Sequence, residues 1–380
     1  MIGRIVNLEK FVKNGKTLVL YGARRTGKTT LLDKYVLENG DQKKVVKYNG
    51  DNLSVQNNFS VNDITKLGKL VDGFDVLAID EAQNIDNIGM SLKILNDERK
   101  DLSVIVSGSS SFVLKGQVGE PLVGRKTTVF LYPLTVGEIV NYHTDKPDKI
   151  VWESLREQLM IYGFYPDSIL ADNDQARADF LLELVDSLLL KDILAFQDVK
   201  GSDILLKLLR LLAFQIGGEV SMEELGNTLG VSKNTAARYL DLLEQAFIVF
   251  RLDGFSRNLR SEINKKSKYY FYDIGVRNAI INNFNNLEMR DDAGQLWENL
   301  VIVERKKYLD YNRQHKNLYF WRTYEKSELD LVEEQNGKLT TFEMKWNPKK
   351  TSKLPAQWIE EYGKTNFATI HRDNLLDFVK

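Results

Sequence analysis

Residues 22–30 read GARRTGKTT, and this stretch decides the fold class. The spacing G-x-x-x-x-G-K-T follows a predicted strand and opens a predicted helix, which is the context that a phosphate-binding loop requires. Backbone N–H groups of such a loop turn toward phosphates, and the helix N-terminus favours negative charge. The motif predicts an ATP site in which Lys28 contacts the β- and γ-phosphates and Thr29 binds Mg²⁺. The expected nucleotide-binding residues are Gly22, Arg25, Thr26, Gly27, Lys28, Thr29 and Thr30.

Short apolar strands alternate with helical segments around this loop. The predicted strands are KTLVLYG (16–22), KKVVKYN (43–49), FDVLAID (74–80), LSVIVSGS (102–109) and KTTVFLYPL (126–134). These runs are nearly continuous and β-branched, which is typical of parallel strands that are covered on both faces. Residues 1–134 are therefore predicted to form an α/β core with a mostly parallel sheet.

Polar residues at the strand ends complete the predicted ATP site. Asp80 ends an apolar strand, where its carboxylate can hold Mg²⁺ through water, and Glu81 follows at once, placed to polarise the attacking water. Ser107 ends the next strand and can sense the γ-phosphate, although a plain turn of Ser and Gly would read the same way. Arg125 precedes the fifth strand, where it can act as an arginine finger on a neighbouring subunit or simply be ion-paired.

The composition argues against several classes of protein and site. Its 380 residues are enough for two or three domains, and the formal net charge of -1 excludes a uniformly basic surface for nucleic acid. With no cysteine and three histidines, a zinc site is not expected. No stretch approaches the roughly 18 apolar residues of a membrane span, and the N-terminus lacks the apolar part of a signal peptide. We expect a soluble cytoplasmic protein with no membrane partner.

In the middle of the chain, the alternation of strands and helices gives way to mostly helical segments. Residues 135–200 read as helical, and residues 201–256 read as a helix, a helix pair and a strand, which predicts a winged helix-turn-helix. The exposed face of its second paired helix carries Lys233, Asn234 and Arg238, which suit phosphate and base-edge contacts with DNA. Acidic residues lie on the same helix, so docking of a protein remains the alternative. A basic connector follows, with Arg257, Arg260, Lys265, Lys266 and Lys268.

Carboxylates recur near the C-terminus. Glu298 lies in a predicted helix, and Asp330 and Glu343 lie in two strands joined by a hairpin turn at 336–337, with Lys345 two residues further on. Carboxylates that converge in this way bind Mg²⁺, and the metal would activate a water, with Lys345 orienting that water rather than binding the metal. The alternatives are carboxylates kept for structure, or an inactive domain that recognises the shape of DNA.

The order of loop, acidic pair, polar strand end and edge arginine resembles the AAA+ class of P-loop ATPases. More closely, YGARRTGKTT, IDEAQ, SGSS, LVGR with YPLTVGEI, the Tyr-Gly-Phe-Tyr-Pro turn and KYYFYDIGVRNAI resemble a prokaryotic group of AAA+ ATPases fused to a winged helix and a nuclease-like domain. The C-terminal pattern D-x(12)-E-x-K resembles the PD-(D/E)XK nuclease superfamily, although no proline precedes Asp330. The resemblance implies a core (1–134), a helical lid (135–200), a winged helix (201–256) and a connector with nuclease-like domain (257–380).

Three functions are compatible with this sequence. The first is ATP hydrolysis coupled to DNA binding or remodelling, with branched DNA as one candidate, by a homo-oligomer that forms a ring or a dimer. The second is a nucleotide-driven signalling switch that acts on protein partners. The third is a Mg²⁺-dependent DNA nuclease gated by ATP.

Overall fold

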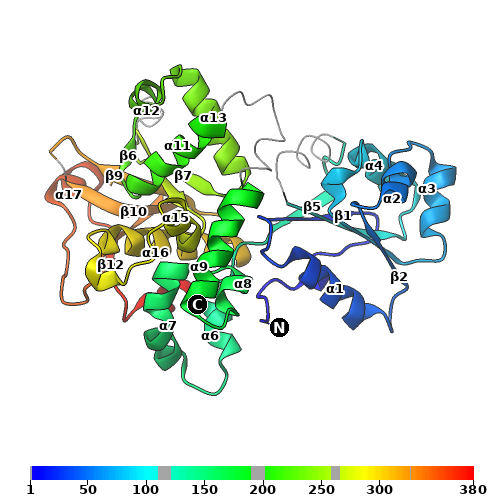
Figure 1. Ribbon diagram of the computed structural model, residues 1–380, viewed down its shortest axis with the longest axis horizontal. Helices are drawn as coiled ribbons and strands as arrows, with labels where there is room; N and C mark the ends of the chain where they lie inside the picture. The colour runs from blue at the N-terminus through cyan, green and yellow to red at the C-terminus, as the bar shows by residue number, and fades with distance from the viewer. Residues whose placement is uncertain (1, 110–120, 190–201, 258–265, 326) are drawn as a thin grey trace. The chain divides into compact units, whose positions relative to one another are not determined.

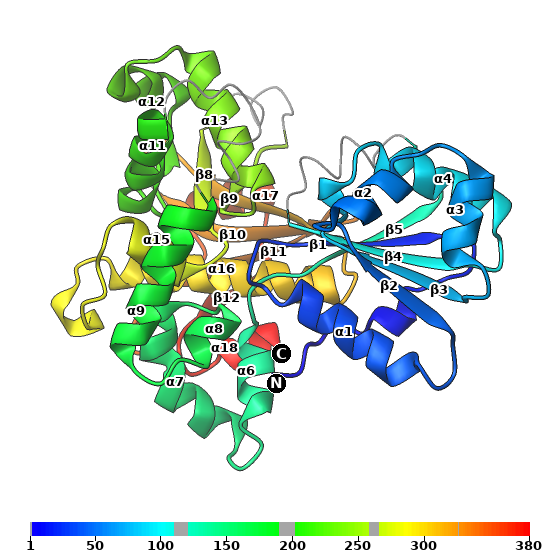
Figure 2. The same ribbon diagram turned by 45° about the vertical axis from the view of Figure 1, so that its right-hand side comes forward.

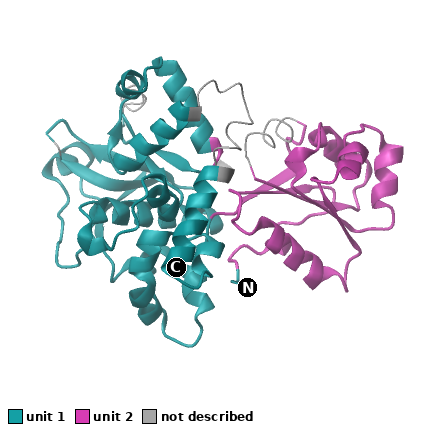
Figure 3. Cartoon of the chain, in the orientation of Figure 1, with its two compact units in different colours: residues 1–3, 133–244, 248–380 teal, residues 4–132, 245–247 magenta. Residues whose placement is uncertain are grey.

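The computed structural model describes residues 2–109, 121–189, 202–257, 266–325 and 327–380. The chain divides into two compact units, which Figure 3 colours separately. We call the first the parallel-sheet unit; it comprises Arg4–Tyr132 and Gln245–Phe247. We call the second the mixed-sheet unit; it comprises Met1–Gly3, Pro133–Glu244 and Ile248–Lys380.

The parallel-sheet unit is a five-stranded sheet with helices on both faces. Its strands are β1 (Thr17–Tyr21), β2 (Val45–Asn49), β3 (Val76–Asp80), β4 (Ser103–Gly108) and β5 (Lys126–Phe130). Their order is β2-β3-β4-β1-β5, and all four pairings are parallel. Its helices are η1 (Leu8–Lys10), α1 (Lys28–Asn39), α2 (Leu53–Phe59), α3 (Ile64–Val71), η2 (Ala82–Asn84) and α4 (Ile88–Glu98). Helix α1 covers one face, and α3 and α4 cover the other (Figures 1 and 2).

Burial explains why these segments become central strands. Every residue of β1, β3 and β4 is buried, so these strands need apolar side chains on both faces. One face packs Val19, Leu77 and Val104 against side chains of α2, α3 and α4, including the fully buried Phe59 and Leu92. These findings confirm the predicted α/β fold with a parallel sheet.

The mixed-sheet unit begins with a group of helices. These are α6 (Val136–Tyr142), α7 (Asp148–Tyr162), α8 (Pro166–Ile169), α9 (Asp174–Glu183) and the π-helical segment η3 (Leu184–Leu189). Next come α11 (Ser202–Phe214), β6 (Glu219–Val220), α12 (Met222–Leu229), α13 (Lys233–Gln245), β7 (Val249–Gly254) and β8 (Ser267–Phe271). In both views α11, α12 and α13 lie together at one end of this unit, and α6 to α9 lie at the other (Figures 1 and 2).

The rest of this unit completes a seven-stranded sheet. It contains α15 (Ile274–Ile280), η4 (Leu287–Met289), α16 (Ala293–Tyr311), β9 (Asn317–Arg322), β10 (Glu328–Gln335), β11 (Lys338–Met344), α17 (Ala356–Tyr362), β12 (Asn366–Ile370) and α18 (Leu375–Val379). The strand order is β12-β11-β10-β9-β7-β8-β6. We call α11, α12 and α13 with strands β6, β7 and β8 the helical module. Strands β7 and β9 pair in parallel over only two residue pairs, which join the helical module to the C-terminal strands β9 to β12. The predicted hairpin is present, with Asn336 and Gly337 both at positive φ between antiparallel β10 and β11.

Two sequence motifs meet inside this unit. The turn after α7 requires Gly163, because a Cβ there would lie 2.1 Å from Asp273 Oδ1. Asp273 accepts hydrogen bonds from the backbone N–H groups of Phe164 (2.6 Å) and Val276 (3.0 Å). The Tyr-Gly-Phe-Tyr-Pro turn and the Asp-Ile-Gly turn are thus one buried joint, which accounts for both motifs without a ligand.

The unit boundary near residue 132 lies close to the predicted end of the core at 134. The other two predicted boundaries, 200/201 and 256/257, fall within the mixed-sheet unit, close to residues 190–201 and 258–265, which lie outside the described residues. The physical reason for one compact unit is that β7 of the predicted winged helix pairs with β8 of the predicted connector on one side and with β9 of the C-terminal strands on the other.

Candidate functional site

The phosphate loop is shaped by two glycines. At Gly22, directly after β1, an added Cβ would lie 2.2 Å from the carbonyl oxygen of Leu131, so no side chain fits there. Gly27 precedes α1 with φ of 91°, a backbone conformation that glycine adopts without strain. These two positions let the chain turn from β1 into α1, and the N-cap residue Gly27 makes no side-chain hydrogen bond to the first turn of the helix.

Lys28 is the first residue of α1, and it is 4% exposed. Its Nζ donates to the carbonyl oxygens of Gly22 (3.0 Å) and Ala23 (2.9 Å), so the ammonium lies across the loop. The Thr26 hydroxyl donates to the same Ala23 oxygen at 2.8 Å. Thr29 and Thr30 are exposed, as is Arg25, which has φ of 62°. An ammonium, two exposed hydroxyls and a helix N-terminus are a donor set that fits ATP with Mg²⁺.

Arg4 supports the loop from outside the motif. Its Nη1 donates to the Thr26 carbonyl oxygen at 2.6 Å, and its Nη2 donates to the Tyr132 carbonyl oxygen at 2.7 Å. The sequence analysis missed this residue, because a single arginine 18 positions before Gly22 carries no spacing signal.

The acidic pair lies at the same edge of the sheet as the loop. Strand β4 separates β1 from β3, so Ser107 lies level with Leu20 of β1 and beside the end of β3. The Ser107 hydroxyl donates to Asp80 Oδ1, and Asp80 is 3% exposed. The backbone N–H of Glu81 lies 3.2 Å from Asp80 Oδ1 and 3.2 Å from Ser107 Oγ. Asp80 is therefore held by two neutral donors, one on the neighbouring strand and one from the next residue along the chain.

Glu81 adopts an unusual backbone conformation, with φ of 49°. Non-glycine residues in this region cost about 1–3 kcal/mol and cluster at functional sites. Its carboxylate accepts a hydrogen bond from Gln83 Nε2, which also lies 3.3 Å from Ser109 Oγ. The Gln83 Oε1 atom is buried, and none of the described residues donates to it, so a water molecule suits this position.

Arg125 lies at the opposite edge of the sheet. It immediately precedes β5, and its carbonyl oxygen accepts from the N–H of Thr17 at the start of β1. Its guanidinium Nε lies 2.7 Å from Asp97 Oδ1, and this hydrogen bond lowers the pKa of Asp97. Because β1 and β5 are parallel, the length of β1 separates Arg125 from its own phosphate loop.

In the mixed-sheet unit, the predicted DNA-contact face of α13 is exposed. Lys233, Asn234 and Arg238 are exposed, and the opposite face of the helix buries its apolar residues Ala236, Tyr239, Leu240 and Leu243. The Ser232 hydroxyl accepts from the Thr235 N–H at 3.1 Å and caps the helix. On the same helix, burial raises the pKa of Glu244 to about 7, although Arg251 opposes the shift.

The C-terminal carboxylates are brought together with lysines. Lys345 Nζ lies 2.6 Å from Glu343 Oε1, and the backbone N–H of Met344 donates to Asp330 Oδ2 at 2.6 Å. On the helix side, Lys268 Nζ lies 3.2 Å from Glu298 Oε1 and also pairs with Glu328. The sequence analysis had not assigned a role to Glu328, which lies two residues before Asp330 on β10.

The electrostatics of this cluster follow from burial and crowding. Burial raises the pKa of Asp330 well above its usual range, and the charges of Glu298 and Glu343 add to the effect. Burial also raises the pKa of Glu343, although its hydrogen bond with Lys345 opposes the shift. For Lys268 burial disfavours the charge, but the three nearby carboxylates outweigh it and raise the pKa.

Each of these carboxylates accepts a hydrogen bond from the protein. Within the described ranges, no group of three or more His, Cys, Asp or Glu residues is placed to hold a metal ion. Lys268, which the sequence analysis placed in the basic connector, does not add to a basic surface, because its side chain is 1% exposed and pairs with the part-buried carboxylates of Glu298 and Glu328. Arg260 and Lys265 of the same predicted patch lie outside the described residues.

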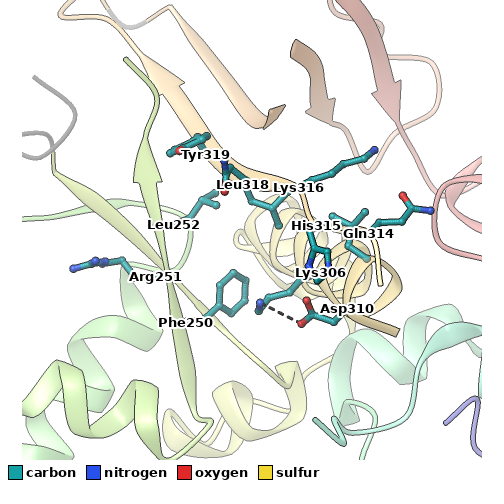
Figure 4. A pocket seen from close by; sticks show the side chains of 12 residues that line it. Phe250, Arg251, Leu252, Lys306, Asp310, Gln314, His315, Lys316, Leu318 and Tyr319 are labelled. Carbon is teal, nitrogen blue, oxygen red and sulfur yellow. Dashed lines mark hydrogen bonds and ion pairs between the residues drawn. The ribbon is translucent and has the colours of Figure 1, made fainter. Parts of the chain in front are cut away.

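A separate cavity of about 410 Å³ lies among β7, the C-terminal end of α16 and β9 (Figure 4). Phe250 and Lys306 point toward its centre, and Lys306 Nζ lies 3.4 Å from Asp310 Oδ2. Lys316 on its rim lies 2.7 Å from Glu333 Oε2. Both lysines therefore have carboxylate partners, and the cavity contains no residue that the sequence analysis assigned to a site.

Three protein families match separate parts of the chain. Residues 14–140 match an AAA domain. Residues 153–287 match a domain of unknown function (DUF8612), and residues 293–373 match another domain of unknown function (DUF4143). Among the described residues, no helix is both long and apolar enough to cross a membrane.

The chain is also similar to several uncharacterised proteins. It is 24% identical over 319 residues to the uncharacterized protein MJ1544 of Methanocaldococcus jannaschii, covering 78% of this chain and 68% of that protein. It is 29% identical over 273 residues to the uncharacterized protein Rv2008c of Mycobacterium tuberculosis, covering 71% of this chain but only 58% of that protein. An uncharacterized protein of Haemophilus influenzae is 27% identical over 75% of this chain and 73% of its own length.

Among solved structures, similarity is low. The Aeropyrum pernix ORC2 protein in its ADP form has a TM-score of 0.35 at 14% identity, over 72% of this chain and 90% of that one. AMPPCP-bound DnaA from Aquifex aeolicus has a TM-score of 0.27 at 14% identity, over 62% of this chain and 84% of that one. Likeness at this level carries no argument about function. The match of residues 14–140, together with the phosphate loop and the sheet order, supports a P-loop ATPase domain of the AAA+ kind in this chain.

Proposed function

We propose that this chain hydrolyses ATP and couples turnover to the binding or remodelling of DNA. The observation that carries the hydrolysis is the hydrogen-bonded set of Asp80, Glu81 and Ser107 at the edge of the sheet where the phosphate loop lies. A buried carboxylate, a following carboxylate and a polar strand end, all beside the loop, are the parts that hydrolysis of a bound nucleotide needs.

Each residue then has a distinct role. Lys28 and the first N–H groups of α1 bind the phosphates, with Gly22, Arg25, Thr26, Gly27 and Thr30 shaping the loop. Thr29 and Asp80 would hold Mg²⁺, which would neutralise phosphate charge. Glu81 orients the attacking water as general base, and Gln83 holds the Glu81 carboxylate while its own buried oxygen accepts from that water. Ser107 fixes Asp80 and senses the γ-phosphate.

Arg125 suggests a homo-oligomer. It lies at the end of β1 away from the loop, and five residues at about 3.3 Å each separate the two edges. Arg125 is therefore too far away to contact the nucleotide of its own subunit, so a role as a finger requires that it leaves Asp97 and contacts the nucleotide of a neighbouring copy. We propose a ring or a dimer in which Arg125 acts as an arginine finger.

The DNA part of the proposal rests on the helical module of the mixed-sheet unit. Helices α11, α12 and α13 are followed by a hairpin, and β6, β8 and β7 form an antiparallel sheet, an arrangement typical of a winged helix-turn-helix. Its second paired helix presents Lys233, Asn234 and Arg238 to solvent for phosphate and base-edge contacts. Residues 135–200 would be the lid, and residues 257–380 would add a nuclease-like domain that recognises DNA, with branched DNA as one candidate.

A protein-directed switch is the second candidate. Asp241 and Glu244 share α13 with the three polar residues, so the helix is not strongly basic. A mixed-charge face of this kind also suits docking of a protein partner. In that case DNA would neither bind nor change the rate of ATP hydrolysis.

Steady-state ATP hydrolysis tests the proposal. The rate is measured with no DNA and with duplex, single-stranded and four-way-junction DNA, and Lys28→Ala serves as the blank. We expect at least one form of DNA to stimulate turnover several-fold. Hydrolysis that no DNA changes, with no DNA binding at low salt, would exclude the DNA part and favour the switch. No hydrolysis above the blank would remove the ATPase assignment itself.

A further inference from the structure

The C-terminal carboxylates enclose a cation that belongs to the chain itself. Lys268 on β8 is 1% exposed, and its Nζ lies 3.2 Å from Glu298 Oε1 on α16. The same Nζ donates to Glu328 Oε1 at the start of β10. It also lies 5.3 Å from the centre of the Phe320 ring on β9, a distance at which the ring face attracts a cation. Three elements thus fix one ammonium in place.

Every carboxylate predicted to bind a metal has a donor from the protein. Glu298 Oε1 accepts a second hydrogen bond, from the Tyr270 hydroxyl at 2.6 Å. Asp330 accepts from the N–H of Met344, and Glu343 accepts from Lys345. A divalent ion needs several carboxylate oxygens at once, and here each carboxylate already has a positive or N–H/O–H partner.

We propose that the Lys268 ammonium takes the place of a metal ion in this cluster, so that the centre holds the strands together and neither binds Mg²⁺ nor cleaves DNA. Two positive charges at metal-ligand separation repel strongly where water is excluded. Lys268 cannot move away from the cluster to make room for a metal, because a buried ammonium without carboxylate partners has too high a free-energy cost. The nuclease-like pattern of Glu298, Asp330, Glu343 and Lys345 would therefore be an electrostatic joint.

The ion pairs of this cluster extend beyond Lys268 to neighbouring strands. Arg322 on β9 lies 3.7 Å from Glu328 and 3.7 Å from Glu219 on β6. The ion pairs therefore connect β6 and β8 of the helical module to α16, β9 and β10 of the C-terminal part. Such a connection keeps the exposed face of α13 fixed relative to the C-terminal sheet, which suits a part that binds without cutting. This inference is independent of whether the chain hydrolyses ATP.

Binding of Mn²⁺ to the full chain without nucleotide tests this directly, with electron paramagnetic resonance counting the bound metal. The expected result is that wild type and Asp330→Asn bind the same amount of Mn²⁺. One Mn²⁺ per chain that is lost in Asp330→Asn and in Glu343→Gln would overturn the proposal. This readout does not involve ATP, so its failure is separate from a failure of the ATPase assignment.

A lysine variant gives the converse test. Lys268→Met should expose the carboxylates and raise the affinity for Mn²⁺ by at least about tenfold, or 1.4 kcal/mol, over wild type. Lys338→Met, which removes an exposed lysine from β11, should leave Mn²⁺ binding unchanged. A folded Lys268→Met protein with no added metal site would contradict the proposal, and if that variant does not fold, the wild-type measurement decides alone.

Discussion

The parallel-sheet unit and the mixed-sheet unit each bring carboxylates close together, but they give them different hydrogen-bond partners. In the parallel-sheet unit, Asp80 accepts from the Ser107 hydroxyl and the Glu81 N–H, which are neutral donors. In the mixed-sheet unit, Glu298 and Glu343 accept from the ammonium groups of Lys268 and Lys345. Neutral donors orient a carboxylate and leave its charge for a ligand, whereas ammonium groups neutralise it within the protein.

This difference teaches how a site is separated from a structural ion-pair cluster. Acidic residues in the right order are common to both units, so residue type alone does not distinguish them. The distinguishing feature is whether a buried lysine from another element lies among the carboxylates, as Lys268 does. Charge balance within the protein is therefore the property to test.

The largest expected effect is at Glu81. Glu81→Gln should lower ATP turnover by about 10² to 10⁴-fold, because the general base is lost while the phosphate loop is intact. Nucleotide affinity should be nearly unchanged, which an equilibrium binding measurement with a fluorescent nucleotide would check. The matched control is Asp86→Asn, an exposed carboxylate five residues further on, which should retain the parent rate. An equal loss of ATP turnover in both variants would contradict the role of Glu81 as the general base.

The next effect concerns stability rather than turnover. Lys268→Met should lower the free energy of unfolding by about 3–5 kcal/mol, because it leaves Glu298 without its cation and Glu328 with only the more distant Arg322. Chemical denaturation measures this, with Lys338→Met as the control that should stay within about 0.5 kcal/mol of wild type. A loss below about 1 kcal/mol at Lys268 would mean that the lysine is not a structural part of the cluster.

A smaller effect is expected on the exposed face of α13. Arg238→Ala should weaken DNA binding and lower the salt dependence, log Kd against log salt, by about one unit if Arg238 contacts a phosphate. Fluorescence anisotropy at several salt concentrations would measure both. The control is Arg99→Ala, an arginine of the parallel-sheet unit that is ion-paired with Asp101. Equal salt slopes for Arg238→Ala and wild type would place the DNA contact elsewhere.

The smallest effect is a pH dependence at Glu244. Its pKa is raised from 4.5 to about 7 in the folded chain, so the folded state keeps a proton that the unfolded state has lost. Stability from this group therefore falls as pH rises from about 4.5 through about 7. Glu244→Gln should match the parent below that window and be more stable than the parent above it. Unfolding curves at several pH values would show this, and a difference independent of pH would refute it.

The sequence was a good guide to the parallel-sheet unit for a physical reason. Central parallel strands must be apolar on both faces, so β1, β3 and β4 are visible as continuous runs, and the phosphate loop between β1 and α1 has a fixed spacing. These signals are local, and the structure contains the strands that they predict. The family match over residues 14–140 agrees with them.

The mixed-sheet unit was harder because its decisive contacts are distant in sequence. Lys268 lies 30 residues before Glu298 and 60 before Glu328, in a run of basic residues that reads as a solvated surface. Nothing in that run marks Lys268 as buried. The parallel pairing of β7 with β9 is equally hidden, because two residue pairs leave no periodic pattern. The hairpin turn at Asn336-Gly337 could be predicted because its sequence signal is local.

The most direct test measures ATP hydrolysis and DNA cleavage side by side, with Mg²⁺ present, for wild type, Glu81→Gln and Asp330→Asn. If the two acidic centres differ as described, Glu81→Gln abolishes ATP turnover, Asp330→Asn retains it, and none of the three proteins cleaves duplex, single-stranded or junction DNA. Mg²⁺-dependent cleavage by wild type that is lost in Asp330→Asn and retained in Glu81→Gln would contradict the account. It would show that the C-terminal carboxylates are a nuclease site despite their lysines.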